Sequence, residues 1–244
     1  MACLSWTFHS PSLRMATHAF VVLPEYPAQP QNTLILLHGL SGACDTWNRR
    51  TSIERYAQKH NLAVIMPEVQ RSWYTDMVYG LPYFTFITDE LPRLAANTLR
   101  VPVDPAHLYV GGLSMGGYGA LKCALRAGDV FSRGASLSGA ADIRQLPPGG
   151  YWEDVFGPRE QIPGSFNDLF AAAKALPPEN RPPLYMWCGT EDSLLPGNHA
   201  LRDHLLALGY DLTYAESAGN HAWQWWDLHI QDVLRWLFPQ TEVK

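Results

Sequence analysis

The chain contains 244 residues, of which 47% are apolar and 17% charged, and its formal net charge at pH 7 is −5. That length fits one large domain spanning residues 1–244, and the apolar fraction excludes a disordered chain. The acidic balance argues against nucleic-acid binding, and no run approaches the roughly 18 apolar residues of a membrane span.

The N-terminus and the cysteines predict a cytoplasmic protein. Met1–Phe8 has no basic start, no long apolar run and no cleavage pattern, so we do not expect a secretory leader. The cysteines are widely spaced and form no Cys-x-x-Cys or Cys/His ligand pattern; they are Cys3, Cys44, Cys123 and Cys188. We expect reduced, buried cysteines and no structural zinc.

Short β-type runs alternate with helical stretches, which is typical of an α/β protein with a mainly parallel sheet and helices on both faces. An N-terminal antiparallel hairpin is predicted at Cys3–His9 and Ala16–Leu23. Further strands are predicted at Thr33–Leu37, Leu62–Met66, Leu108–Gly111, Gly134–Leu137, Leu184–Cys188 and Leu212–Ala215. Helices are predicted at Ile53–Lys59, Tyr83–Leu99, Met115–Ala127, Asn198–Leu208 and Trp223–Leu237. Pro92 is expected to kink or divide the second of these helices.

Residues 142–183 interrupt this alternation. The segment is rich in proline and glycine and contains one helix-like stretch, Phe166–Leu176. Long irregular connections inside a compact domain are usually lids or binding loops, and a surface excursion without a role is the alternative. We therefore expect a lid-like or pocket-forming insertion here.

The run Gly112-Leu113-Ser114-Met115-Gly116 matches the nucleophile-elbow pattern G-x-S-x-G. Both glycines are needed because a Cβ on either side of this strained turn would collide with neighbouring backbone. The apolar run His107–Gly111 precedes the serine and a helix-like stretch follows it. Ser114 is therefore predicted to be a nucleophile, rather than an incidental serine in a glycine-rich turn.

A serine hydroxyl needs a general base and a third group that orients the base. On this type of sheet the acid and the histidine follow the serine, on loops after later strands. His221 is the histidine predicted between the last strand and the last helix, so it is the predicted base. Asp192 is favoured as the acid, and its neighbour Glu191 stays open as the alternative.

The oxyanion of an acyl-transfer reaction needs backbone N–H donors. One is predicted at Met115, where the free N–H groups of a helix N-terminus favour negative charge. The second is predicted at Leu40, in the glycine-containing loop His38–Gly42 that follows an early strand.

Taken together, these residues resemble the esterase branch of the α/β-hydrolases, which holds tributyrin-type short-chain esterases and S-formylglutathione hydrolases. The resemblance runs over nearly the whole chain. It is carried by HGLSGACDTWNRRTSIERYA (His38–Ala57), MPEVQRSWYTDMVYG (Met66–Gly80), ELPRL (Glu90–Leu94), GLSMGGYGA (Gly112–Ala120), GTEDSLL (Gly189–Leu195) and AGNHAWQWW (Ala218–Trp226).

The resemblance implies an α/β-hydrolase fold and a serine carboxylesterase that acts on short-chain acyl esters. Its triad is Ser114, His221 and Asp192, and its oxyanion donors are Leu40 and Met115. The resemblance implies a small-molecule ester as the partner, no metal and no organic cofactor, and it allows a homo-oligomer.

Other functions use the same residues. An S-formylglutathione hydrolase-like thioesterase is the runner-up, a feruloyl or acetyl esterase is also open, and acyl transfer to an alcohol needs the same triad. A hydrolase fold that serves as a binding module is the non-enzymatic alternative, but such proteins usually lose a triad member.

The aromatic residues divide into two sets. Trp223 and Trp226 follow helical spacing and are predicted to pack in the core behind His221. The other set falls in the oxyanion-side and lid-like loops and is predicted to wall the substrate pocket. Its members are Trp47, Trp73, Tyr74, Tyr151 and Trp152.

Overall fold

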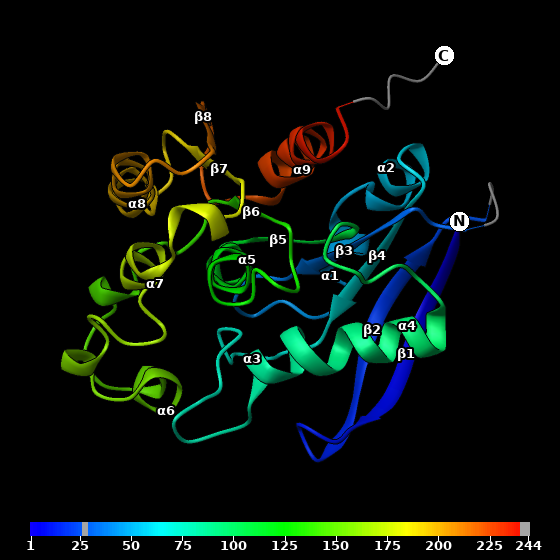
Figure 1. Cartoon of the computed structure of the whole chain (residues 1–244), viewed down its shortest axis with the longest axis horizontal. Helices are drawn as coiled ribbons and strands as arrows, with labels where there is room; N and C mark the ends of the chain where they lie inside the picture. The colour runs from blue at the N-terminus through cyan, green and yellow to red at the C-terminus, as the bar shows by residue number, and fades with distance from the viewer. Residues whose placement is uncertain (26–28, 240–244) are drawn as a thin grey trace.

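The computed structural model describes residues 1–25 and 29–239, and within them eight strands form one sheet (Figure 1). The strand order is β1-β2-β4-β3-β5-β6-β7-β8. β1 pairs antiparallel with β2 and β2 with β4, whereas the pairs from β4 to β8 are parallel. The strand bounds are β1 Ala2–Ser10, β2 Met15–Leu23, β3 Asn32–Leu37, β4 Leu62–Pro67, β5 Leu108–Leu113, β6 Arg133–Leu137, β7 Leu184–Gly189 and β8 Leu212–Ser217.

Helices cover both faces of the sheet (Figure 1). Their bounds are α1 Thr46–Arg50, α2 Ile53–Lys59, α3 Tyr83–Thr85, α4 Leu91–Leu99, α5 Met115–Arg126, α6 Tyr151–Phe156, α7 Leu169–Ala175, α8 Leu195–Ala207 and α9 Trp223–Leu237. The predicted α/β-hydrolase class, with its N-terminal hairpin and mainly parallel sheet, is confirmed. No helix in the described residues is long and apolar enough to cross a membrane.

Two hydrophobic cores lie on opposite faces of the sheet, because successive strand side chains point to alternate sides. Leu34 and Leu36 of β3 pack in the core beneath α1, α2 and α9. Ile35 and Leu37 of the same strand pack in the larger core beneath α4, α5, α7 and α8. The central strands β3, β4 and β5 are thus buried on both faces, which explains their continuous apolar sequences.

The stretch Tyr83–Leu99 is divided, as Pro92 suggested, but the irregular part lies just before the proline. A π-helical turn, η1 (Phe86–Glu90), joins α3 to α4 without a break in the helical run. Pro92 has no N–H and its ring would clash with the carbonyl four residues earlier in an α-helix. The wider turn therefore accommodates the proline.

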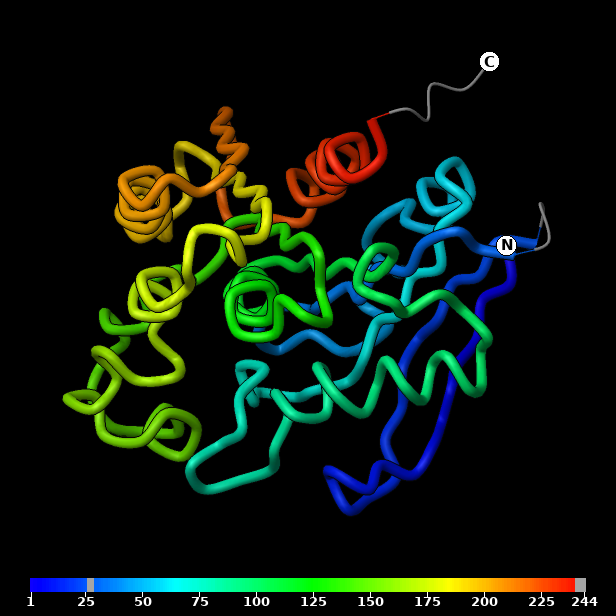
Figure 2. The backbone as a smooth tube through the Cα atoms, in the orientation of Figure 1, coloured from blue at the N-terminus to red at the C-terminus, as the bar shows by residue number. Residues whose placement is uncertain are grey.

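The segment 142–183 is more ordered than the sequence predicted. It contains α6 and α7, which lie among three short 3₁₀ turns: η2 Ile143–Gln145, η3 Arg159–Gln161 and η4 Pro178–Asn180. Figure 2 shows that it lies at the far end of the molecule from the β1–β2 hairpin. It also meets the loop before α3, since the Val78 and Tyr79 N–H groups donate to Val155 and Asp154 carbonyls.

The cysteine prediction is correct for three residues and wrong for one. Cys44, Cys123 and Cys188 are buried, whereas Cys3 is exposed, and all four are free. Cys3 lies on β1, the edge strand of the hairpin, and its side chain is exposed there. A small apolar residue on a half-exposed edge strand need not be buried.

Candidate active site

Ser114 lies on the sharp turn between β5 and α5. Its backbone has φ 54° and ψ −118°, a sparsely populated region for a residue with a side chain. A Cβ on Gly112 would lie 2.4 Å from the Gly116 carbonyl oxygen, and one on Gly116 would lie 2.4 Å from the Leu37 carbonyl oxygen. Both glycines of the elbow pattern are therefore required by close backbone approach.

The structure brings Ser114, His221 and Asp192 together, although they are far apart in sequence. His221 Nε2 lies 2.9 Å from Ser114 Oγ, and His221 Nδ1 lies 2.8 Å from Asp192 Oδ2. The Asp192 side chain is 0% exposed, whereas that of His221 is 34% exposed on the cleft side. Glu191 is exposed, and its carboxylate takes no part in this chain of hydrogen bonds.

Asp192 is held as a carboxylate by its hydrogen bonds. Burial acts to raise the Asp192 pKa, but the hydrogen bond and charge of His221 and the N–H of Leu194 outweigh it. The pKa of Asp192 therefore lies below its ordinary value. Leu194 N–H donates to Oδ1 at 2.9 Å, so each carboxylate oxygen has a partner.

The two loops that carry Asp192 and His221 are clamped together at the ends of β7 and β8. Glu191 N–H donates to the Gly219 carbonyl at 2.9 Å. A Cβ on Gly189 would lie 2.1 Å from the same carbonyl oxygen, so the loops meet backbone to backbone. The Trp226 ring packs edge-on against the His221 imidazole, with 4.8 Å between ring centroids.

The loop His38–Gly42 lies directly against the elbow, because a Cβ on Gly39 would be 3.4 Å from Ser114 Cβ. In the described chain, the Leu40 N–H has no acceptor. Met115 is the first residue of α5, so its N–H has no partner within the helix. Leu40 and Met115 therefore each keep a backbone N–H without an acceptor in the part of the chain that the structure describes, next to the elbow.

His38, at the start of this loop, is buried and contacts the segments on either side of it. The sequence did not predict this structural role. Its Nδ1 lies 2.8 Å from the Gly39 carbonyl oxygen, and Val69 N–H points at its Nε2 at 3.4 Å. Tyr74 Oη donates to the His38 carbonyl at 2.8 Å. Burial lowers the pKa of His38, although the Gly39 hydrogen bond and the charge of Glu68 oppose this.

A cleft of about 360 Å³ opens onto Ser114 and His221. One wall is the loop Gly39–Gly42 with helix α1, of which Thr46, Arg49 and Arg50 line the cleft. The other wall is Trp223 and Trp226 from the first turn of α9. The cleft therefore combines an aromatic wall with a cationic rim.

The predicted pocket aromatics do not line this cleft. Trp47 and Tyr74 are fully buried, and Trp47 Nε1 donates to the Leu37 carbonyl at 3.0 Å. Trp73 is buried and packs edge-on against the half-buried Trp152. Tyr151 lines a separate cleft of about 220 Å³ beside Arg71.

Trp223 and Trp226, which the sequence assigned to the core, form the aromatic wall instead. Trp226 belongs to the core beneath α9 and also borders the cleft. The place of α9 in the chain could have indicated this role. The helix starts only two residues after His221, so its first turn lies beside the site. Helical spacing shows which side chains share a face but not which other segment that face meets.

The fold and this site define the class. A serine on the strand–helix turn after β5, hydrogen-bonded to a histidine after β8 and through it to an aspartate after β7, is the arrangement of an α/β-hydrolase. The family described as "Putative esterase" matches residues 10–237. The chain belongs to this esterase family and is a serine hydrolase.

Curated and solved relatives agree with this membership. An acetyl esterase of Caldicellulosiruptor saccharolyticus is 29% identical, over 97% of this chain and 98% of that protein. The structure of FphF, a fluorophosphonate-binding serine hydrolase of Staphylococcus aureus, has a TM-score of 0.90 at 32% identity and covers 97% and 98% of the two chains. The S-formylglutathione hydrolase FrmB of the same organism has a TM-score of 0.87 at 32% identity, with the same coverage.

Proposed function

We propose that the protein hydrolyses short-chain carboxylic esters through an acyl-enzyme on Ser114. The observation that carries this proposal is the pair of hydrogen bonds, 2.9 and 2.8 Å, that links Ser114 to His221 and His221 to Asp192.

The four free cysteines support a cytoplasmic location, because thiols persist in a reducing compartment.

His221 is the general base in this proposal. Its Nε2 takes the Ser114 proton as Oγ bonds to the ester carbonyl carbon, and the carbonyl electrons move onto oxygen. When the tetrahedral intermediate collapses, the C–O bond to the alcohol breaks and His221 returns the proton to the alcohol. Water then attacks the acyl-enzyme in the same way, which releases the acid and restores the serine hydroxyl.

Asp192 and the two free amides complete the proposed machinery. The buried carboxylate accepts the Nδ1–H of His221, which orients the ring and stabilises the imidazolium. The N–H groups of Leu40 and Met115 donate to the oxyanion, and the N-terminus of α5 favours its negative charge. Such donors are each worth about 3 kcal/mol of transition-state stabilisation.

The cleft supports a short acyl group. Arg49, Arg50 and Thr46 occupy the α1 side of the cleft, whereas Trp223 and Trp226 supply an apolar wall beside His221. An acetyl or butyryl group can pack against the two rings, whereas a longer chain would have to pass the charged groups. Desolvating those groups without a partner would cost binding energy.

Fluorophosphonate labelling tests the assignment, and the chain supplies a matched control. Ser217 Oγ lies 3.1 Å from His229 Nε2, and His229 Nδ1 lies 2.7 Å from Asp232 Oδ2, so the chain holds a second Ser–His–Asp contact. Ser217 lies at the end of β8 rather than on an elbow, and its Oγ also accepts from the Trp187 indole at 3.1 Å.

We expect Ser114→Ala to abolish labelling and to lower kcat on p-nitrophenyl acetate by about 10⁴-fold or more. Ser217→Ala should be labelled and turn over substrate like the wild type. Circular dichroism of both variants checks their folding. A folded Ser114→Ala variant with near-wild-type turnover would refute the proposal.

A thioesterase that acts on an anionic thiol ester is the second candidate, favoured by the cationic rim. Arg49 pairs with Asp45, but Arg50 has no ion-pair partner in the described chain. An S-acyl glutathione carries carboxylates that Arg50 could bind. The similar protein FrmB is described as an S-formylglutathione hydrolase.

This candidate predicts that Arg50→Gln raises KM for S-formylglutathione several-fold and leaves KM for a neutral acetate ester unchanged. Arg55→Gln, on α2, is the matched control, because Arg55 does not line the cleft. Steady-state kinetics at two salt concentrations measure the effect, which should shrink at high salt. If Arg50→Gln changes KM equally for both substrates, the thioesterase candidate is rejected and the neutral-ester function remains.

A further inference from the structure

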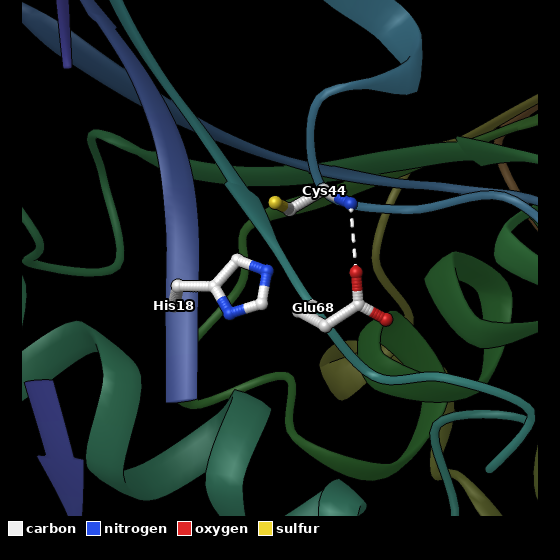
Figure 3. A group of neighbouring side chains, drawn as sticks. All are labelled: His18, Cys44 and Glu68. Atoms are coloured by element: carbon white, nitrogen blue, oxygen red, sulfur yellow. Dashed lines mark hydrogen bonds between the residues drawn. The ribbon is translucent and has the colours of Figure 1, made fainter. Parts of the chain in front are cut away.

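Three side chains with different metal-binding atoms meet near the oxyanion-side loop but outside the Ser114 cleft. His18 comes from β2, Cys44 from the loop between β3 and α1, and Glu68 from the residue after β4. Figure 3 shows the three side chains gathered around one point. A nitrogen, a sulfur and an oxygen atom of the group all lie within 4.8 Å of one another.

Backbone contacts hold this cluster in place. β2 and β4 are neighbouring strands, and the Glu68 N–H donates to the His18 carbonyl at 3.1 Å. The Cys44 N–H donates to Glu68 Oε2 at 3.0 Å (Figure 3). Three segments of the chain are thus tied together at this point without any ion.

We propose that His18, Cys44 and Glu68 form a binding site for one zinc-like divalent metal ion. Imidazole, thiolate and carboxylate are the ligands that Zn²⁺ and Co²⁺ take, whereas Ca²⁺ and Mg²⁺ prefer oxygen alone. Three protein ligands leave a fourth position for water.

Metal binding requires the ligand atoms to approach one another by up to about 1 Å. Ligand atoms of a tetrahedral zinc site lie roughly 3.3–3.8 Å apart, given bonds of 2.0–2.3 Å. Exposed His18 can rotate inward to close part of this distance, and its exposure gives the ion a path from solvent. Glu68 Oε1 accepts from Gln70 N–H and Oε2 from Cys44 N–H, and each oxygen keeps a second lone pair for the metal.

Binding requires the Cys44 thiol to release its proton to solvent as the metal–sulfur bond forms. Burial raises the pKa of Cys44 to about 11, and the charges of Glu68 and Asp45 act in the same direction. The metal must displace that proton, so each binding event releases one proton.

The site adjoins the elements that hold the oxyanion loop. Glu68 Oε1 lies 3.8 Å from His38 Nε2, and Cys44 follows Leu40 by four residues in the same connection. A metal that draws Cys44 and Glu68 together shifts this connection, and a displacement near 1 Å can cost about 100-fold in rate. Bound metal should therefore inhibit the esterase; this step rests on the proposed function, whereas binding does not.

Titration of the metal-free full chain with Co²⁺ tests binding directly. We expect one equivalent to bind with a thiolate-to-cobalt charge-transfer band that Zn²⁺ abolishes. Cys44→Ser should remove the band, and His18→Ala should weaken binding by at least about tenfold. Cys3→Ser and His9→Ala change an exposed cysteine and an exposed histidine of β1 and are the matched controls.

The outcomes separate the two parts of the inference. A band that survives in Cys44→Ser, or no stoichiometric binding by the wild type, overturns the site. Zinc inhibition of acetate-ester turnover that disappears in His18→Ala supports the coupling, and equal inhibition of both proteins overturns it. Circular dichroism and metal-free turnover of each variant verify its fold.

Discussion

Asp192 and Glu191 are adjacent in sequence, but their carboxylates lie in different surroundings. Asp192 is buried and accepts from His221 and Leu194, whereas Glu191 is exposed and contributes its backbone N–H to the clamp on Gly219. The lowered pKa keeps Asp192 ionised at neutral pH, so its carboxylate can accept a hydrogen bond from His221 Nδ1–H.

We therefore predict that Asp192→Asn lowers kcat by about 10⁴-fold, because an amide at this position favours the wrong imidazole tautomer. Glu191→Gln should stay within about twofold of the wild type, since its carboxylate contacts solvent. Steady-state turnover of p-nitrophenyl acetate measures both. A larger loss in Glu191→Gln than in Asp192→Asn would transfer the acid role to Glu191.

At the scale of secondary-structure elements, the elbow is also where the first turn of α5 packs closely against the sheet. Gly116, in the first turn of α5, touches the carbonyl of Leu37 at the end of β3. Backbone atoms cannot move aside as a flexible side chain can. The nucleophile turn and the helix–strand contact are thus one structural feature, and they depend on the same glycine.

We predict that Gly116→Ala destabilises the protein by about 3 kcal/mol or more, because its Cβ would lie 2.4 Å from the Leu37 oxygen. Gly111→Ala is the matched control inside β5, where the nearest atom to the new Cβ is 3.6 Å away. That change should alter the free energy of unfolding by less than about 1 kcal/mol. Denaturant unfolding measures both, and equal effects would contradict the packing argument.

Elements with a local signal could be predicted from the sequence. Strands β3 and β4 appear as continuous apolar runs, and α2 and α9 match the predicted bounds. Ser114 was marked by the short pattern Gly112-Leu113-Ser114-Met115-Gly116, which can be read from five consecutive residues. His221 and Asp192 could be proposed because their order along the chain restricts the choice.

Features that depend on contacts between distant segments could not be predicted. Helix α6 lies in a proline-rich stretch with no clear period, and it is held by hydrogen bonds to the loop before α3. Loop aromatics such as Trp73 look available for substrate but are buried by that same contact. His18, Cys44 and Glu68 follow no recognisable metal-binding spacing in the sequence, because they come together only when β2 pairs with β4.

At the scale of the whole molecule, Lys122 joins the segment 142–183 to the body of the protein. Its side chain projects from α5 and is fully buried. The ammonium donates to Thr75 Oγ1 at 2.7 Å and to Asn167 Oδ1 at 2.8 Å, and it faces the rings of Phe84 and Phe166. One residue thus links the nucleophile helix, the loop before α3 and the insertion.

This link has an electrostatic cost. Burial is the main cause that lowers the pKa of Lys122 from 10.5 to about 7, and Arg126 adds to the effect, while Cys123 and Asp76 oppose it. The unfolded chain keeps the proton up to pH 10.5, whereas the folded protein releases it near pH 7. Since the unfolded state binds more protons in this interval, this group makes the free energy of unfolding rise with pH.

We predict that this single group adds about 2 kcal/mol to the free energy of unfolding between pH 7 and pH 9. Lys122→Met should flatten that slope, because methionine fills a similar volume and does not titrate. Lys174→Met, on the exposed side of α7, is the matched control and should keep the wild-type slope. Urea unfolding at the two pH values measures the difference between slopes, which does not depend on how much either substitution changes stability itself. If Lys122→Met retains the full slope, Lys122 is charged in the folded protein at both pH values, and the three segments meet around an ammonium ion rather than a neutral amine.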